Sequence, residues 1–341
     1  MVDNLADLNI KDDFYFQWHI TESCNWSCRH CYQDYKKKDD LPLAKLTEIF
    51  RRMEDAVIKW GKHGTVSFTG GEPFLRKKEL HELMTYLDKS DYFAYYDILT
   101  NGSLISKNEA KKLTTYKKLR RIQVSLEGAT PETNDEIRGS GSFNSVLKAI
   151  KNVQEQNIDV SVMMTITRKN KDEIPALIKT LGRMGVQALA LERFVPEGQG
   201  KNMKDLVLGS HELRDLYKNI YQIAINNSPL RILLYRPLFN LVAEDDPTVG
   251  ALCSAGNNAL TIMPDGTVYP CRRLPIPIGN ILSDGLYKIW YGSEVLWKLR
   301  DPGNLKGKCH DCEFLTRCRG CRAMAYFVNG DYMAEDPQCW K

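Results

Sequence analysis

The sequence predicts an α/β fold: a partial (β/α)6 barrel built on a parallel sheet, followed by a smaller cysteine-rich C-terminal domain. Six stretches with strand-like alternation are each followed, after a short connection, by a helical pattern. This order is typical of a parallel sheet. Six strands suit an open partial barrel better than a closed barrel of eight strands. The regular succession of strand and helix patterns ends after about residue 195. Seven of the ten cysteines follow residue 252.

The predicted barrel elements rest on hydrophobic periodicity. Alternation of apolar and polar residues predicts strands, as in the first one, where Phe14, Phe16 and Trp18 alternate with polar residues. The predicted strands cover 14–23, 65–69, 95–99, 122–126, 160–167 and 186–194. Apolar residues three and four apart predict amphipathic helices. The predicted helices cover 43–60, 77–89, 107–116, 143–156 and 174–184.

Beyond the barrel we expect a loop at 196–200, a helix at 213–226 and a strand at 231–235. A hairpin is predicted at 258–271, because apolar flanks surround the turn residues Pro264-Asp265-Gly266. We divide the chain into a barrel with its linking helix, residues 1–235, and a C-terminal domain, residues 236–341.

Composition excludes several classes of function. The net charge of +4, from 47 basic and 43 acidic residues, is too small to predict nucleic-acid binding. No apolar run reaches the roughly 18 residues of a membrane span. The N-terminal stretch Met1–Asp7 has neither the basic start nor the apolar core of a signal peptide. We therefore expect a cytoplasmic protein, in which ten cysteines indicate metal binding rather than disulfides.

Three cysteines stand close together after the first predicted strand. Three residues separate Cys24 from Cys28, and two separate Cys28 from Cys31. Thiolates are the usual protein ligands of a four-iron cubane cluster, and three of them leave one iron open for a small molecule. The alternatives are a zinc site, which normally takes four ligands at other spacings, or buried free thiols.

This loop resembles the signature of the radical S-adenosylmethionine (radical SAM) family, with His30 at the position that is usually aromatic and lies against the adenine. Gly70-Gly71-Glu72-Pro73, at the end of the second strand, resembles the GGEP motif of that family, whose backbone and acid hold the methionine amine of SAM. The resemblance implies that a 4Fe–4S cluster binds SAM through its fourth iron and is held by Cys24, Cys28 and Cys31.

The resemblance implies further SAM contacts at the ends of later strands. Ser125 and Arg138 would bind the SAM carboxylate, since a guanidinium and a carboxylate form a strong charge-assisted contact. Asn101 is a candidate for the ribose or the carboxylate, and Leu191 for a backbone contact to the adenine. Without the resemblance to the family, Arg138 is equally well interpreted as a solvent-exposed residue of a helix.

The seven late cysteines resemble the SPASM extension of radical SAM enzymes, which carries two auxiliary 4Fe–4S clusters. A zinc ribbon requires about 15–20 residues between its cysteine pairs, and here there are five. The resemblance assigns three cysteines to a first auxiliary cluster, which are Cys253, Cys271 and Cys321. It assigns four to a second, which are Cys309, Cys312, Cys318 and Cys339. One iron of the first cluster would then lack a cysteine ligand.

The resemblance implies an enzyme that generates a 5′-deoxyadenosyl radical and abstracts hydrogen from a substrate. Three functions stay open: oxidative modification or crosslinking of a ribosomally made peptide, modification or decarboxylation of a porphyrin-type molecule in an alternative haem pathway, and a non-catalytic iron–sulfur carrier. We favour a peptide, because few arginines are available for several porphyrin carboxylates. The intact SAM motifs disfavour a carrier. Arg272 disfavours sulfatase maturation, whose enzymes have an acidic residue there.

The expected partners follow from this chemistry. A flavodoxin or ferredoxin would donate electrons. A separate protein would bind a leader peptide, because the first predicted strand begins too close to the N-terminus for a leader-binding domain to precede it. The sequence assigns no catalytic acid or base. The candidate positions for a catalytic acid or base are Tyr235, Arg236, Glu192 and Arg272.

Overall fold

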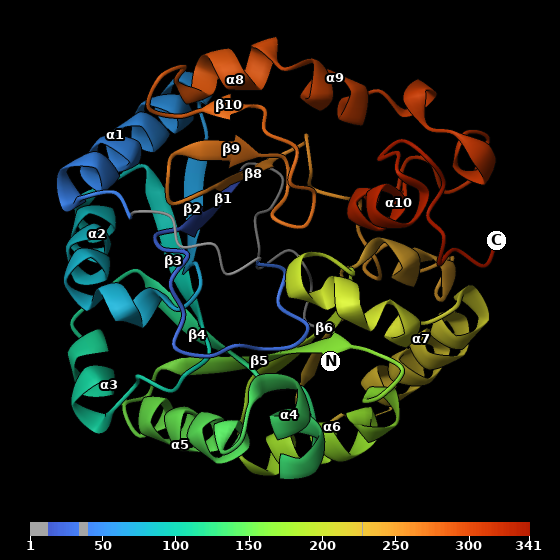
Figure 1. The fold of residues 1–341 in the computed structure, drawn as a ribbon, viewed down its shortest axis with the longest axis horizontal. Helices are drawn as coiled ribbons and strands as arrows, with labels where there is room; N and C mark the ends of the chain where they lie inside the picture. The colour runs from blue at the N-terminus through green and yellow to red at the C-terminus, as the bar shows by residue number, and fades with distance from the viewer. Residues whose placement is uncertain (1–12, 34–39, 227) are drawn as a thin grey trace.

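The computed structural model describes residues 13–33, 40–226 and 228–341. The stretch Met1–Asp7, on which the expectation of no signal peptide rests, lies outside the described residues. Figure 1 shows the strands arranged around the inside of a ring and the helices around its outside. The predicted partial barrel is therefore confirmed.

Six strands form the barrel, each parallel to the next one along the chain. They are β1 (Asp13–His19), β2 (His63–Thr69), β3 (Phe93–Thr100), β4 (Leu119–Ser125), β5 (Asp159–Ile166) and β6 (Ala188–Arg193). The helices between them cover the outer face of the sheet (Figure 1). They are α1 (Leu43–Trp60), α2 (Lys77–Lys89), α3 (Lys107–Leu113), α4 (Pro131–Arg138), α5 (Ser142–Gln154) and α6 (Ile174–Arg183).

The C-terminal part continues the same sheet at both edges. Helix α7 (Ser210–Ile225) leads to β7 (Arg231–Leu233), which pairs in parallel with β6. The predicted hairpin is formed by β8 (Ala259–Ile262) and β9 (Thr267–Tyr269), and β8 pairs in parallel with β1. The sequence did not predict this last pairing, which carries one sheet across the predicted boundary at residue 235. The remaining elements are β10 (Gly279–Asn280), α8 (Leu286–Gly292), α9 (Glu294–Arg300) and α10 (Arg322–Asn329).

Two predicted elements end earlier than their periodicity indicated. The helix predicted to reach residue 116 ends at Leu113, because the hydroxyls of Thr114 and Thr115 bond the carbonyls of Lys111 and Lys112 and so close the last turn locally. The strand predicted to reach residue 23 ends at His19, and the chain then turns into the cysteine loop.

The two faces of the barrel sheet differ in polarity. Phe14, Phe16 and Trp18 of β1 are almost completely buried in the core that packs beneath the helices. The alternate residues face the barrel interior, and they are largely polar. One row of register partners across β1 to β4 consists of Gln17, Ser67, Asp97 and Arg121. The interior therefore suits a polar ligand rather than a hydrophobic core.

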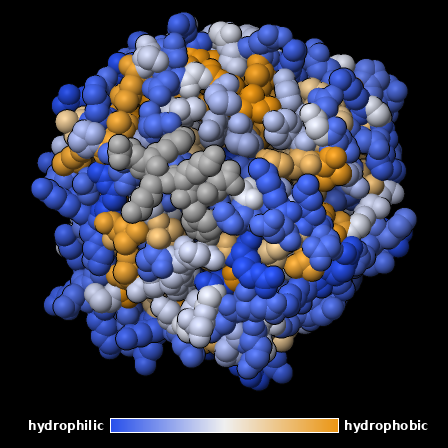
Figure 2. Space-filling view, viewed as in Figure 1, coloured by the Kyte–Doolittle hydropathy of each residue, from blue (hydrophilic) through white to orange (hydrophobic). Residues whose placement is uncertain are grey.

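Figure 2 shows a largely hydrophilic face on which apolar side chains form small separate areas. No helix in the described part of the chain is both long and apolar enough to cross a membrane.

Candidate active site

The first three cysteines lie on the loop that follows β1. Backbone N–H groups approach two of the sulfurs: Trp26 N lies 3.4 Å from the Sγ of Cys24, and Gln33 N lies 3.5 Å from the Sγ of Cys31. Burial raises the pKa of Cys28 to about 11, although Arg138 opposes the shift. A thiol with so high a pKa is a poor nucleophile. Metal ligation, which deprotonates thiols, accounts better for three cysteines on one loop.

The two glycines of the second motif let two stretches of backbone approach each other. Gly71 N donates to the carbonyl of Thr21, and Glu72 N donates to that of Ser23, each at 2.9 Å. A Cβ atom on Gly70 would lie 2.3 Å from the Thr21 oxygen, and one on Gly71 would lie 2.2 Å from the Ser23 oxygen. The glycines therefore fix the end of β2 against the segment that leads into Cys24.

The carboxylate of Glu72 is completely buried and joins the ends of β2 and β3. It accepts from the hydroxyl of Thr100 at 2.8 and 2.9 Å, from Asn101 N at 2.8 Å and from Phe74 N at 3.0 Å. Burial nevertheless raises the pKa of Glu72 to about 7. A nearby N–H donor or cation would stabilise the ionised form, so the position suits the methionine amine that the resemblance assigned to it.

Arg138, at the end of α4, is buried and paired with Glu127, which follows β4. Its Nε and one terminal nitrogen lie 3.1 and 2.6 Å from the same carboxylate oxygen. His30 Nε2 lies 3.1 Å from that oxygen, and a second terminal nitrogen of Arg138 is 3.8 Å from the Sγ of Cys28. Glu127 therefore ties the cysteine loop to Arg138, and the solvated interpretation of Arg138 is wrong.

The other predicted SAM contacts lie at the same edge of the sheet. The amide of Asn101 donates to Asn25 at 2.9 Å and is 3.8 Å from the Sγ of Cys24. Ser125 ends β4 and is partly exposed. Leu191 is buried in the apolar core from β6, so only its backbone is placed to meet a ligand.

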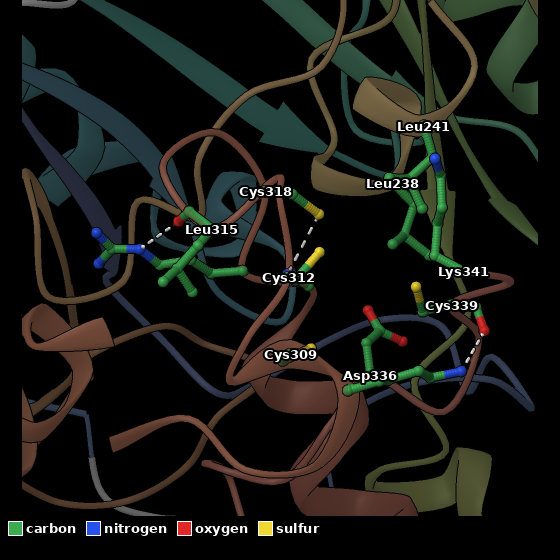
Figure 3. A pocket seen from close by; sticks show the side chains of 12 residues that line it. Leu238, Leu241, Cys309, Cys312, Leu315, Cys318, Asp336, Cys339 and Lys341 are labelled. Carbon is green, nitrogen blue, oxygen red and sulfur yellow. Dashed lines mark hydrogen bonds between the residues drawn. The ribbon is translucent and has the colours of Figure 1, made fainter. Parts of the chain in front are cut away.

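The late cysteines fall into two groups in space. Cys271 and Cys321 lie within electrostatic range of Cys253, whose pKa burial raises to about 11. The other four line a cavity of about 40 Å³, together with Asp336 and apolar side chains (Figure 3). These four are Cys309, Cys312, Cys318 and Cys339. The grouping is the one that the sequence assigned, and the cluster assignment itself stays a prediction.

Among the described residues, no three or more His, Cys, Asp or Glu side chains converge on the position of a single metal ion. Two backbone N–H groups point at sulfurs of the second group, at 3.4 Å in each case, from Phe314 to Cys312 and from Gly320 to Cys318. Such contacts are common at the thiolates of iron–sulfur clusters, whose potentials they tune. The donor set fits clusters better than a zinc ion.

Between the two cysteine regions lie Arg236 and Arg272, which the sequence marked as candidate positions, together with Arg273, which it did not. Arg236 and Arg273 both bond Glu192, the latter at 2.9 Å. Arg272 pairs with Glu197 at 2.9 Å, and its guanidinium lies 4.3 Å from the ring centre of Tyr32. Arg272 therefore joins the segment after Cys271 to the segment after Cys31.

Sequence reasoning missed two groups that organise this region. Glu127 stands two residues after Ser125, and an acid so close to a predicted SAM-binding serine was the available signal. Arg193 and Asp336 form a buried pair at 2.9 Å, and Asp336 also accepts from Cys321 N at 2.7 Å. Nothing local in the sequence joins these two residues.

The fold and the two cysteine regions define an iron–sulfur enzyme built on an α/β barrel. The profile of the Radical SAM superfamily matches residues 18–181, and that of the SPASM iron–sulfur cluster-binding domain matches residues 253–322. The chain is 30% identical over 336 residues to the mycofactocin maturase MftC of Mycolicibacterium smegmatis, covering 94% of this chain and 81% of that protein. The chain belongs to the radical SAM superfamily and carries a SPASM domain.

Other relatives and structures agree with this family. The chain is 29% identical over 337 residues to the AdoMet-dependent heme synthase of Methanosarcina barkeri, covering 94% of this chain and 95% of that protein. Streptococcus suis SuiB bound to precursor peptide SuiA shares the fold with a TM-score of 0.77 at 17% identity, over 99% of this chain and 78% of that one. The native anSMEcpe structure with bound AdoMet has a TM-score of 0.75 at 19% identity, over 95% and 93%.

Membership of this family settles the cofactors that the sequence predicted. The barrel binds a 4Fe–4S cluster and S-adenosylmethionine, and the SPASM domain binds auxiliary iron–sulfur clusters. The protein is an enzyme, which removes the alternative of a non-catalytic carrier.

Proposed function

We propose that this enzyme oxidatively modifies or crosslinks a ribosomally synthesised peptide. The cluster and SAM, when bound, would supply the radical chemistry for abstracting a hydrogen atom from a substrate carbon. The observation that carries the choice of substrate is the pairing of the arginines near the barrel interior. Arg193, Arg236, Arg272 and Arg273 are all paired with an acid of the chain.

A charge count favours a substrate with few carboxylates. Glu192, Glu197 and Asp336 offset three of those four guanidinium charges. Asp97 offsets one of the two charges of Arg120 and Arg121, so about two positive charges remain for a ligand. A porphyrin-type molecule with several carboxylates requires several arginines, each of which binds a carboxylate through two N–H donors. A peptide segment brings one carboxylate or none. The relative named mycofactocin maturase and the structure of SuiB with a precursor peptide also support a peptide.

A porphyrin-type substrate is the second candidate. The relative named AdoMet-dependent heme synthase aligns with 95% of its own length, so the two chains have nearly the same extent. That similarity favours a shared substrate class, against the charge count above.

For the SAM site, we propose that Cys24, Cys28 and Cys31 hold the cluster and that Ser125 and Arg138 bind the SAM carboxylate. Glu72 would accept from the methionine amine of SAM, with Gly70 and Gly71 shaping the backbone beside it. His30 would lie against the adenine, Asn101 against the ribose or carboxylate, and the backbone of Leu191 against the adenine.

The expected partners and location complete the proposal. The reaction needs an electron donor such as a flavodoxin or ferredoxin, and a separate protein would hold a leader peptide. None of the ten cysteines forms a disulfide, which fits the reducing cytoplasm. The two-domain division at residue 235 is retained as a division by function, because the sheet itself is continuous.

The test incubates the reduced holoenzyme and SAM with the short peptides encoded beside its gene and, separately, with porphyrin carboxylates, and follows products by mass spectrometry. We expect a peptide to lose two hydrogens and deuterium to move from it into 5′-deoxyadenosine. Turnover of a porphyrin carboxylate, with every co-encoded peptide unchanged, would reject the proposal in favour of the second candidate.

A further inference from the structure

Two guanidinium groups share one carboxylate near the inner face of the barrel. Glu192 is the penultimate residue of β6, and one of its oxygens accepts from Arg236, which follows β7. Its other oxygen accepts from Arg273 at 2.9 Å, and Arg273 follows β9. Three elements far apart in the sequence therefore meet at one acid.

The three side chains differ in exposure. The side chain of Glu192 is 7% exposed, whereas those of Arg236 and Arg273 are 31% and 26% exposed. The acid is thus buried behind its partners, and the two guanidinium groups present their remaining donors to a ligand. The Nε of Arg236 has no hydrogen-bond partner among the described residues.

The positive charge of this group is incompletely offset. Two guanidinium groups face one carboxylate, and burial together with Arg273 lowers the pKa of Arg236 to about 10. Two uncharged groups also bond the pair: the Tyr235 hydroxyl lies 3.1 Å from Arg236, and the carbonyl of Arg193 accepts from Arg273 at 3.2 Å. The sulfurs of Cys271 and Cys321 lie within electrostatic range of Arg236. Asp97, another acid of the barrel, is already bonded by two other arginines.

The position of the group connects the SAM site with the first set of auxiliary cysteines. Glu192 lies opposite Thr165 in the sheet, and Thr165 N donates at 2.7 Å to Glu127, which holds Arg138. On the other side, Arg273 stands two residues after Cys271. A ligand held here would lie between the two cysteine regions.

We propose that Arg236 and Arg273 together bind one carboxylate of the substrate. Glu192, on the buried side of both guanidinium groups, orients them. The identification of that ligand as a peptide carboxylate rests on the function proposed above; it is either the C-terminus or an acidic side chain. A planar fork matches a carboxylate in geometry as well as in charge, and the contact is strong where solvent is partly excluded.

The test uses three acetylated dipeptide probes and the anaerobic holoenzyme. The first is acetyl-glycyl-phenylalanine with a free C-terminal carboxylate, the second is its C-terminal amide, and the third is acetyl-glutamyl-phenylalanine amide. Saturation-transfer NMR measures their binding without turnover. We expect the first or the third probe to bind about tenfold or more tightly than the neutral amide, and the tighter of the two identifies the source of the carboxylate.

Variants assign the preference to these residues. Arg236→Gln and Arg273→Gln should each abolish the preference for the carboxylate, Arg236→Lys should retain part of it, and Arg231→Gln, at an exposed arginine of β7, should leave it unchanged. Iron content and SAM binding confirm that each variant is folded. Equal binding of all three probes to the wild-type enzyme, or a carboxylate preference that survives both Gln variants, would overturn the proposal. Because the readout is binding, it stands apart from whether any peptide is turned over.

Discussion

The guanidinium of Arg138 is held by the carboxylate of Glu127 through two nitrogens, at 3.1 and 2.6 Å from one oxygen. Both side chains are buried, and Arg138 lowers the pKa of Glu127 to about 2 despite its burial. The acid therefore stays charged throughout the physiological range. Its charge fixes Arg138 beside Cys28, so the contact to SAM that we propose for Arg138 would be preorganised.

Arg138→Ala should weaken SAM binding about ten- to a hundredfold, because a charge-assisted contact to a carboxylate is worth about 1.5–3 kcal/mol. Calorimetry on the reconstituted enzyme measures the change, with iron content as the check that the clusters remain. Arg168→Ala is the matched control, since Arg168 forms an exposed pair with Glu212. Unchanged affinity in the Arg138 variant would reject its role.

Glu127→Gln tests the acid separately. It leaves Arg138 buried without its counter-charge, a change that costs about 3–5 kcal/mol when a buried pair is broken. We expect a lower free energy of unfolding and weaker SAM binding together. The pKa of Glu127 is depressed, so its contribution to stability is present above the ordinary glutamate pKa and is lost as pH falls toward about 2. The wild-type protein should therefore lose more stability than the variant as pH falls from 5 to 3.

SAM binding should release a proton below neutral pH. The pKa of Glu72 is raised to about 7 without ligand, and an N–H donor of the methionine amine beside it favours the carboxylate. Affinity should then increase as pH rises toward about 7. Calorimetry in two buffers of different ionisation enthalpy counts the protons released at pH 6. The count should fall by about one proton in Glu72→Gln and stay unchanged in Glu109→Gln. An unchanged count in both variants would show that Glu72 is not a source of the released protons.

The sequence predicted the features that depend on local patterns. Strand alternation and helical spacing located the six barrel strands, and the short spacing of Cys24, Cys28 and Cys31 predicted a cluster loop. Both signals lie within a few residues of chain. The family could be predicted because it also rested on contiguous motifs, and the comparisons with known proteins confirmed it.

The contacts that the sequence could not predict are those between residues that are distant along the chain. Glu192 meets Arg273 across 81 positions, and Arg193 meets Asp336 across 143. The pairing of β8 with β1 is of the same kind, since register partners such as Tyr15 and Ala259 carry no pattern that identifies each other. Only the folded barrel brings such groups together, so the site was predicted by its motifs but not by its ion pairs.

Removal of the first cysteine set tests the catalytic cluster. Replacing Cys24, Cys28 and Cys31 by Ala should remove about four of about twelve irons per chain after anaerobic reconstitution, because three cubane clusters are expected. Cleavage of SAM to 5′-deoxyadenosine should be abolished. A triple variant that still forms 5′-deoxyadenosine under reducing conditions would contradict the assignment of these cysteines.

The two late sets should differ in ligation. Three cysteines stand within electrostatic range of one another around Cys253, and four line the cavity near Asp336. We therefore expect one iron of the first auxiliary cluster to lack a cysteine ligand and to bind added cyanide, with a changed EPR spectrum. The second cluster should not respond. A fourth cysteine on the first cluster in a crystal structure of the holoenzyme would refute this expectation.

The buried pair of Arg193 and Asp336 should be essential for the C-terminal part of the chain. Their side chains are 5% and 0% exposed, and Asp336 also accepts from the backbone N–H groups of Cys321 and Gln338. Asp336→Asn leaves a buried guanidinium without its counter-charge, which should lower the free energy of unfolding by about 3–5 kcal/mol.

Anaerobic urea unfolding of the holoenzyme measures that change. Glu313→Gln is the matched control, because Glu313 forms an exposed pair with Lys341 and exposed pairs contribute little. Asp336 lies beside both sets of late cysteines, so its variant should also reconstitute with fewer auxiliary irons while retaining the iron of the first cysteine loop. Full stability together with full iron content in Asp336→Asn would show that the pair does not organise this region.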